Sequence, residues 1–339
     1  MAALSDVSVG VANEATPGTY ATPTRWWEVL PPEFDVVKNT VQGQGMRVGT
    51  RVDRSGRRVI VSMAGSGKFG LEAVTKGMGL LFESMLGTSA VTLVSGSTYQ
   101  HNFTYSTGVT IPSRTIQVGA VETGGTVDAH SYLGCMVDTW DVEIGSAENG
   151  LIVVTTNWDA MNYSTAQAYA APSYAAAPSL FHGGQVAVTL GGVVTAPTTI
   201  ALATGGTAVT NVRSFKLSGD NQAQKNRWNF LGTGRKARQL VGDLGITGEL
   251  EVEYSDTVVR DAFLADTELA LTVTVTSTEA LSTGFAQLQF TLPAIKLDGE
   301  MPKPSGTDTP TLKVPFKVLD NLTATQPIWI STRTADTAA

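Results

Sequence analysis

Three short segments of this chain recur, in the same order, 178 or 179 residues further on. SGRR at 55–58 corresponds to TGRK at 233–236, GLEAV at 70–74 to ELEVE at 249–253, and LLFESML at 80–86 to VVRDAFL at 258–264. Self-similarity at a nearly constant offset indicates a duplicated folding unit, so both halves must be able to adopt one structure. The 339 residues suffice for two such units, each with its own core.

The second copy indicates what that structure is. In GELEVEY, Leu250, Val252 and Tyr254 alternate with three glutamates, which is the period of a half-buried strand. Transferred to the first copy, the pattern points Leu71 toward a core. We therefore predict a strand in both places.

The same comparison excludes a phosphate site in MAGSGKFGLEAV, residues 63–74. A phosphate-binding loop needs serine or threonine after its lysine, whereas Phe69 follows Lys68. It also needs a helix to begin there, and the repeat predicts a strand. Lys68 is interpreted as a solvated lysine on a strand.

A short helix is predicted after the strand in each copy. Leu81, Phe82 and Met85 share one helical face, and Gly87 can end the helix with a positive φ. In the second copy Asp256 can cap a helix whose buried face includes Val258, Val259, Ala262 and Phe263.

The remaining pattern is that of an all-β protein. Short runs rich in Val, Thr, Ile and Tyr stand between many of the 35 glycines. Further strands are expected at 99–105, 114–120, 132–144, 151–158, 212–218, 246–254, 269–277, 285–292 and 311–319. The predicted fold class is mainly β, with two tandem β-sandwich or barrel domains, each flanked by a short α-helix.

Composition also suggests where these domains begin and end. The charge-free segment STAQAYAAPSYAAAPS reads as a linker, and both ends of the chain are small and polar. We expect an extended N-terminal arm at 1–24, a first domain at 25–165 with a long loop at 42–58 and a helix near 77–86, a linker at 166–183, a second domain at 184–330 with a helix near 256–265, and a flexible tail at 331–339.

No catalytic, metal or cofactor constellation emerges from the residues. The net charge of −7 argues against a conventional nucleic-acid binder, and the single Cys135 cannot form an internal disulfide. Carboxylates cluster at Asp138, Asp141 and Glu143, and a carboxylate pair could hydrolyse a glycoside. A polar outer strand face explains them more simply, so we expect no enzyme and no cofactor.

The conspicuous residues are instead candidate contact residues, and most of them lie in loops. Glycine-rich segments before the long strands carry arginines, whose planar guanidinium groups pair with carboxylates across a contact. Adjacent tryptophans in RWWEVLPP point to opposite faces of a strand, which leaves one of them either for a protein contact or to be covered by the N-terminal arm. The predicted assembly interface comprises Arg47, Arg51, Arg54, Arg57, Arg58, Trp26, Trp27, Arg235 and Lys236.

Several of these segments, taken together and in order, resemble the major tail tube proteins of long-tailed bacteriophages. They are VGVANEATPGTYATPT at 9–24, the loop QGQGMRVGTRVDRSGRR, GSGKFGLEAV followed by GMGLLFESMLG, and LTVTVTST with FTLPAIKLDGEMP near the end. The resemblance covers most of the chain and consists of strand, loop and helix patterns.

The resemblance implies a structural virion protein whose subunits polymerise into stacked rings. The rings would enclose a channel for the ejection of double-stranded DNA, which passes without specific binding. Implied partners are further copies of the chain, the tape measure protein, and tail terminator and distal tail proteins, with no membrane. Assembly would take place in the bacterial host cytoplasm. The loop at 42–58 would contact a neighbour or the next ring, and residues 1–24 would brace it.

The duplication departs from simple tube proteins, which carry one barrel and form hexameric rings. Two barrels per chain favour a trimeric, pseudo-hexameric ring, with a hexamer as the other possibility. Two other functions stay open at this point: a surface β-sandwich that binds glycans, as an adhesin does, and a carbohydrate-active enzyme using the carboxylates named above.

Overall fold

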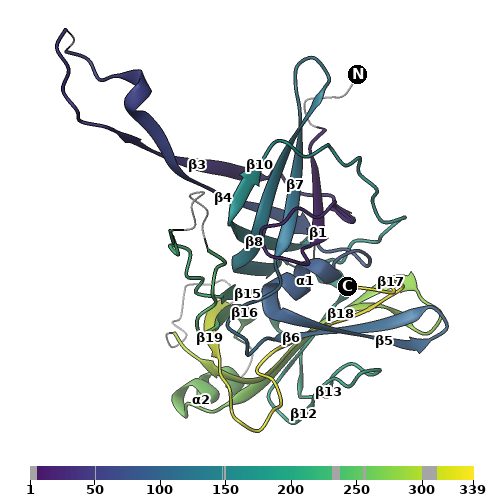
Figure 1. Cartoon of the computed structure of the whole chain (residues 1–339). Helices are drawn as coiled ribbons and strands as arrows, with labels where there is room; N and C mark the ends of the chain where they lie inside the picture. The colour runs from purple at the N-terminus through teal and green to yellow at the C-terminus, as the bar shows by residue number, and fades with distance from the viewer. Residues whose placement is uncertain are drawn as a thin grey trace.

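The computed structural model describes residues 6–49, 51–146, 148, 150–230, 237–254, 257–299 and 311–339. It is mainly β, as predicted, with two α-helices among these residues (Figure 1). Eighteen of the described strands are connected by pairing. None of the described helices has the length and apolar character needed to cross a membrane.

In the first half of the chain the described residues form ten strands and one α-helix. They are β1 (Ser8–Asn13), β2 (Arg25–Trp27), β3 (Glu33–Gln42), β4 (Arg58–Glu72), α1 (Gly79–Leu86), β5 (Gly87–Ser95), β6 (Thr98–Tyr105), β7 (Arg114–Val121), β8 (Val127–Ile144), β9 (Ile152–Ala160) and β10 (Asn162–Ser164). The single turn η1 (Ser55–Arg57) lies before β4. The segment around Lys68 is therefore a strand, as the repeat predicted.

The second half follows after the turn η2 (Gly183–Gln185). Its elements are β11 (Val186–Leu190), β12 (Val194–Thr195), β13 (Thr204–Gly205), β14 (Ala208–Val209), β15 (Val212–Asp220), β16 (Gly245–Glu253), α2 (Val258–Leu264), β17 (Leu269–Ala280), β18 (Phe285–Leu297), β19 (Thr311–Val318) and β20 (Trp329–Thr334). Strands were predicted at most of these places.

The pattern of strand pairing in the first half is repeated in the second. In the first half β1 pairs with β7, β7 with β8, β8 with β9 and β10, β9 with β4, and β4 with β3. In the second half β11 pairs with β17, β17 with β18, β18 with β19 and β20, β19 with β16, and β16 with β15. A helix follows β4 and another follows β16.

Even an irregularity of the ladder is repeated. The β7–β8 register shifts by one residue between Arg114↔Cys135 and Ile116↔Tyr132. The β17–β18 register shifts in the same way between Leu269↔Ile295 and Leu271↔Leu292. Because a bulge is a specific local feature of a strand, its recurrence at matching positions supports the duplication inferred from sequence. We call the two copies of this pattern the first unit and the second unit.

The two units are joined by strand pairing within the chain. The second half of β8 pairs with β9 on one side and with β15 on the other, so Leu217 lies opposite Val142. The hairpin β5–β6 has no counterpart in the second unit, and its β6 pairs with β20. The sheets therefore run from one unit into the other.

One continuous run of the sheet has the order β3-β4-β9-β8-β15-β16-β19. Its side chains alternate between a buried apolar face and a solvent-facing polar face. Phe69, Trp140, Phe215 and Phe316 are on the buried face and are at most 2% exposed. Helix α1 packs against β5, β6 and β8, and seven of its eight residues are buried. As predicted, it ends at Gly87, which has a φ of 102°.

The prediction of an unpacked N-terminal arm is wrong for residues 8–13. They form β1, which lies between β2 and β7 and is buried except for Asn13. The following turn is fixed by Glu14, whose carboxylate accepts hydrogen bonds from Gly18 N, Ser113 Oγ, Thr115 Oγ1 and Gly134 N. Small polar residues pack here because one carboxylate satisfies the surrounding donors.

The prediction of a flexible tail at 331–339 is also wrong for its first part. Strand β20 extends to Thr334 and is paired on both sides, by β18 and β6. Asp336 Oδ2 then accepts a hydrogen bond from Gly77 N at 2.5 Å. The backbone of Ala339 lies so close to Gly79 that a Cβ there would be 2.4 Å away.

The segment predicted as a linker, 166–183, connects β10 to β11 without a helix or strand before η2. It packs on the first unit through Gln117, which donates to Ala168 O and accepts from Ala170 N. Phe181 at its end is buried. The second helix is α2, and the cap predicted at Asp256 lies outside the described residues.

Candidate functional surfaces

The polar face of the seven-stranded run is the largest feature that the two units build together. Each strand contributes alternate residues to it, and the pairing register brings them into rows across the sheet. One row runs from Glu72 through Val153, Glu143 and Lys216 to Glu249. The face is polar in both units because the opposite face of the same strands forms the core.

This polar face carries more acidic than basic side chains. The ten acidic side chains are Glu33, Asp35, Glu72, Asp141, Glu143, Asp159, Asp220, Glu249, Glu251 and Glu253, and the five basic ones are Lys68, Arg213, Lys216, Lys313 and Lys317. Ion pairs join Lys68 to Glu33 at 3.2 Å and Lys313 to Glu249 at 3.5 Å. The excess charge of the face is therefore negative, and it is spread over both units.

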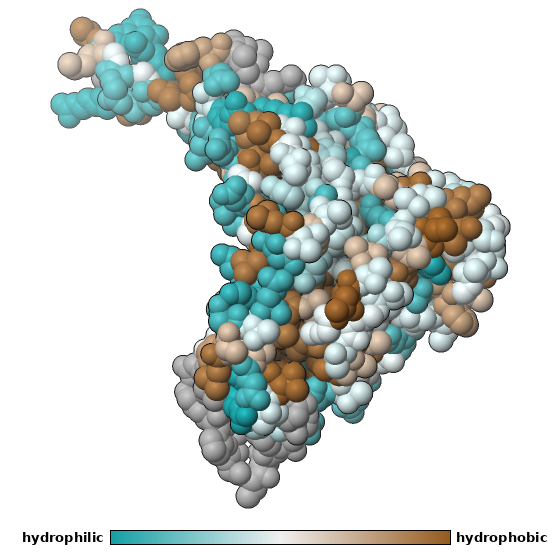
Figure 2. Space-filling view, turned by 90° about the horizontal axis from the view of Figure 1, so that it is seen from below, coloured by the Kyte–Doolittle hydropathy of each residue, from teal (hydrophilic) through white to brown (hydrophobic). Residues whose placement is uncertain are grey.

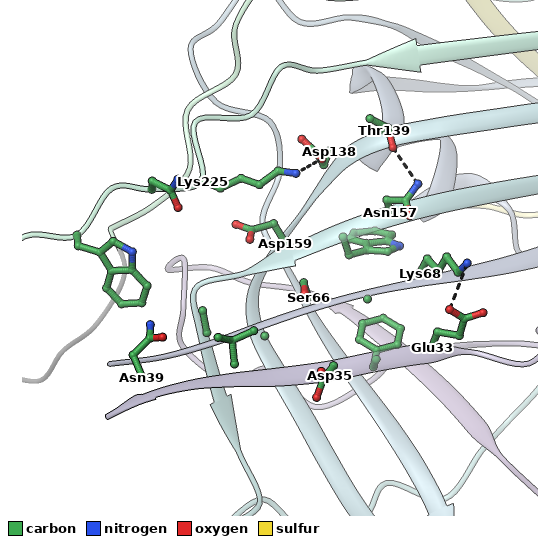
Figure 3. Close-up of a pocket in the computed structure, with 18 residues that line it drawn as sticks. Glu33, Asp35, Asn39, Ser66, Lys68, Asp138, Thr139, Asn157, Asp159 and Lys225 are labelled. Carbon is green, nitrogen blue, oxygen red and sulfur yellow. Dashed lines mark hydrogen bonds and ion pairs between the residues drawn. The ribbon is translucent and has the colours of Figure 1, made fainter. Parts of the chain in front are cut away.

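A groove of about 810 Å³ lies at one end of the face (Figure 3). In it Lys225 forms an ion pair with Asp138, which sits at a bulge of β8. Asp159 Oδ2 accepts a hydrogen bond from Gln239 at 2.7 Å. Figure 3 shows Lys225 reaching from the loop after β15 toward the sheet. The carboxylates of this groove hold the second unit's loop on the first unit.

The three carboxylates considered for an enzyme have separate roles in the structure. Asp138 is paired with Lys225 as described, and Asp141 accepts a hydrogen bond from Ser218 across the junction between the units. Glu143 is exposed on the polar face. Asp138 and Asp141 therefore both hold residues of the second unit against the first.

The second conspicuous surface is an arm formed by β3, the first part of β4 and the loop between them, residues 36–64. Figure 1 shows it projecting from the body of the molecule, and Figure 2 shows the same projection from another side, with hydrophobic residues among its polar ones. It contains the loop that the sequence predicted. A two-stranded hairpin alone is at best marginally stable in water, so its length calls for a support outside this chain.

Five of the six arginines predicted for the interface lie on this arm and are exposed: Arg47, Arg51, Arg54, Arg57 and Arg58. Arg57 covers the glycines of the loop, since a Cβ on Gly45 would meet its guanidinium group. Arg58 donates to Thr40 Oγ1, and Gln42 donates to Arg54 O. Within the described residues none of the five forms an ion pair, so their charges are available to a neighbour.

The arm also exposes apolar side chains. Met46 and Val48 are 101% and 99% exposed, and Val37, Val41, Val52, Val59, Ile60 and Val61 are about half exposed or more. Apolar patches of this kind on an otherwise polar surface typically mark contacts with another protein. The sequence showed the arginines as a cluster. The apolar residues of the arm were not predicted as part of a contact surface because their spacing is that of ordinary strand residues.

The two tryptophans separate as the strand pattern predicted. Trp27 is 4% exposed, packs against Phe69 with the two rings tilted by 40°, and donates its indole N–H to Gly77 O at 2.7 Å. Trp26 is half-buried and lies opposite Gly10 of β1. Trp27 is thus used within its own chain, and we do not include it in the assembly surface. Arg235 and Lys236 lie outside the described residues.

The remaining titratable groups serve the fold. His101 is buried beside Asp336 O, and burial lowers its pKa from 6.5. Burial also raises the pKa of the Cys135 thiol, with Glu14 adding to the shift. Among the described residues, no group of three or more His, Cys, Asp and Glu side chains is placed to hold a metal ion.

Comparison with known proteins places these surfaces in context. A family model described as a phage tail tube protein matches residues 5–318, which is nearly the whole chain. A search among curated proteins returned no match.

Proposed function

Because the chain belongs to the phage tail tube protein family, a structural family of the virion tail, we propose that it is the repeating subunit of a tube that conducts double-stranded DNA. In this proposal the polar face of the seven-stranded run lines the channel. The observation that carries it is the continuity of that face across both units, with an excess of acidic side chains.

An acidic channel wall suits the passage of DNA. A cation that contacts a phosphate releases counterions and adds affinity, so a basic wall would hold the DNA. Acidic side chains repel the phosphates and leave the polymer free to slide. The excess of acidic side chains on the face agrees in sign with the net charge of −7 for the whole chain.

Ring formation follows from the same architecture. A sheet with free edges tends to pair with another copy, and a closed ring removes those edges. Two similar units per chain favour a ring of three chains with six similar positions, and six chains are the alternative. The arm then braces a neighbouring chain or the next ring, and the tape measure protein occupies the channel before ejection.

Electron microscopy tests the assembly directly. Negatively stained protein should show annular particles or cylinders roughly 100 Å wide, as expected for a ring of small domains. Native mass spectrometry then gives the number of 35.6 kDa chains in a ring. A protein that stays monomeric at all concentrations would refute the tube and favour a glycan-binding module.

A charge reversal tests which face lines the channel. Glu72→Lys with Glu143→Lys changes two positions of one row on the polar face, of which Glu143 is exposed and Glu72 is half-buried. Assembled tubes of this variant should retain short duplex DNA in a salt-dependent way, unlike the parent protein. Glu28→Lys with Glu122→Lys makes the same charge change elsewhere on the surface and serves as the control. Equal DNA binding by both variants would refute the assignment of the face.

A further inference from the structure

A cavity of about 400 Å³ opens at one end of the second unit, between β11, β14 and β15. The end of β8 and the turn η2 also border it, so both units and the segment between them contribute to its wall. Its floor consists of the buried side chains of Ile144, Val188 and Phe215. Its rim includes the exposed Ala208 and Arg213. The cavity is therefore apolar inside and accessible from the solvent.

The internal repeat identifies the corresponding place in the first unit. Val9 of β1 and Val188 of β11 occupy matching positions relative to the bulges of β7 and β17. They are 179 residues apart, which is also the offset between GLEAV and ELEVE in the sequence. Val9 lies opposite Trp27 of β2, and Val188 lies opposite Val209 of β14. Val209 therefore stands where the first unit has Trp27.

Trp27 fills this place in the first unit. Its side chain is 4% exposed, and the centroid of its ring lies 5.7 Å from that of Phe69. The cavity beside Trp27 measures only about 50 Å³. Val209, which has no ring, borders the cavity of about 400 Å³. The larger cavity of the second unit thus accompanies the exchange of a tryptophan for a valine.

The walls of the cavity suit an aromatic molecule. Sites for small molecules are typically apolar hollows of roughly 300–1,000 Å³ with few polar groups. Cavities with apolar walls stay free of water and take up aromatic molecules. Phe215 offers a ring on which a second ring can stack, and its centroid lies 6.1 Å from that of Phe290 and 6.3 Å from that of Phe316. The guanidinium group of Arg213, paired with Glu253 at 3.1 Å, places a cation at the rim, where it can face such a ring.

We propose that this cavity binds a free planar aromatic molecule of about the size of an indole, in the place that the side chain of Trp27 takes in the first unit. The ligand lies against Val188, Val209 and Phe215. Because all the walls belong to one chain, the site does not depend on the assembly of a tube.

Equilibrium dialysis of the full chain against indole tests the site. We expect one indole per chain with a dissociation constant of roughly 0.1–1 mM, as is usual for a ligand of this size bound mainly by apolar contacts. No saturable binding in this range would overturn the proposal.

Two substitutions locate the binding. Val209→Trp places an indole ring in the cavity, as in the first unit, and Ala208→Trp covers the mouth from an exposed position that tolerates substitution. Each should weaken indole binding by at least roughly tenfold. Ala90→Trp makes the same change at an exposed strand residue of β5 and should leave the affinity unchanged. A folded Ala208→Trp chain that binds indole as the parent does would overturn the assignment.

The converse substitution tests the correspondence between the units. Trp27→Val leaves a valine in both places and should create a second indole site per chain. Indole should also raise the thermal midpoint of this variant more than that of the parent, because a ligand stabilises the folded state that binds it. Equal shifts of the two midpoints would overturn the correspondence on which the site rests.

The same dialysis with assembled particles distinguishes a free ligand from a side chain of a neighbouring chain. Particles should bind indole as tightly as the unassembled chain does. Binding by the unassembled chain that disappears in particles would assign the cavity to a neighbour's side chain and overturn the proposal, while leaving the tube function intact.

Discussion

The apolar tip of the arm allows a quantitative prediction about assembly. Met46 and Val48 are fully exposed, so replacing both by serine removes no contact within the chain. Fully burying one such side chain contributes about 1.5–3 kcal/mol. If a neighbouring chain covers about half of each, Met46→Ser with Val48→Ser weakens each contact by about 1.5–3 kcal/mol, or roughly 10- to 150-fold.

The assay is the critical concentration for assembly, measured by sedimentation, together with the thermal midpoint of the unassembled chain. The critical concentration should rise within the range given above, and the midpoint should change by less than about 2 °C because exposed substitutions cost little. Thr92→Ser with Thr110→Ser changes two residues outside the arm and should leave both quantities unchanged. An unchanged critical concentration for the arm variant, or a marked fall of its midpoint, would refute the reasoning.

Three further predictions concern the chain itself, each read from denaturant unfolding. Glu14→Ala leaves four hydrogen-bond donors without their acceptor and should lower the unfolding free energy by about 3 kcal/mol or more. An effect below about 1 kcal/mol would contradict the role given to this carboxylate. Arg114→Met breaks the ion pair with Glu83, whose nitrogen and oxygen atoms are 2.7 Å apart, and should cost about 3–5 kcal/mol; adding Glu83→Gln should recover part of the loss, and no recovery would argue against the pair. Because burial lowers the pKa of His101 in the folded state, the unfolding free energy should fall as the pH drops below 6.5 through the lowered pKa; His101→Gln should flatten this dependence, and an unchanged slope would assign it to other groups.

Most of the long strands and both helices could be predicted from the sequence because alternation and helical periodicity report burial on one side, whereas β3 and β5 were not predicted. Leu250 and Val252 point to the core for this reason, and Gly87 ends α1 with the positive φ that glycine allows. Strand β1 was missed because both of its faces are covered, so that all residues from Ser8 to Ala12 are buried. No alternation remains in such a strand.

The end of the chain and the polar face show a second limit. Thr334 looks like tail sequence, yet it is buried because β20 lies between β18 and β6 and its hydroxyl donates to Thr75 O. Most acidic residues of the polar face lay on predicted strands, with the exception of Glu33 and Asp35 on β3. Their union into one surface depends on the pairing of β8 with β15, strands separated by long stretches of sequence, and no local pattern encodes such a pairing.

The pairing of β8 with β15 also has a kinetic and entropic consequence. Because both strands belong to one polypeptide, this contact forms at the effective concentration set by the connecting chain and costs no translational freedom of a second molecule. In a ring of such linked pairs, half of the unit-to-unit contacts are complete before any two molecules meet. Fewer molecules must then meet in dilute solution before the ring closes. When a ring opens, every second contact between units is still intact and only the others must form again.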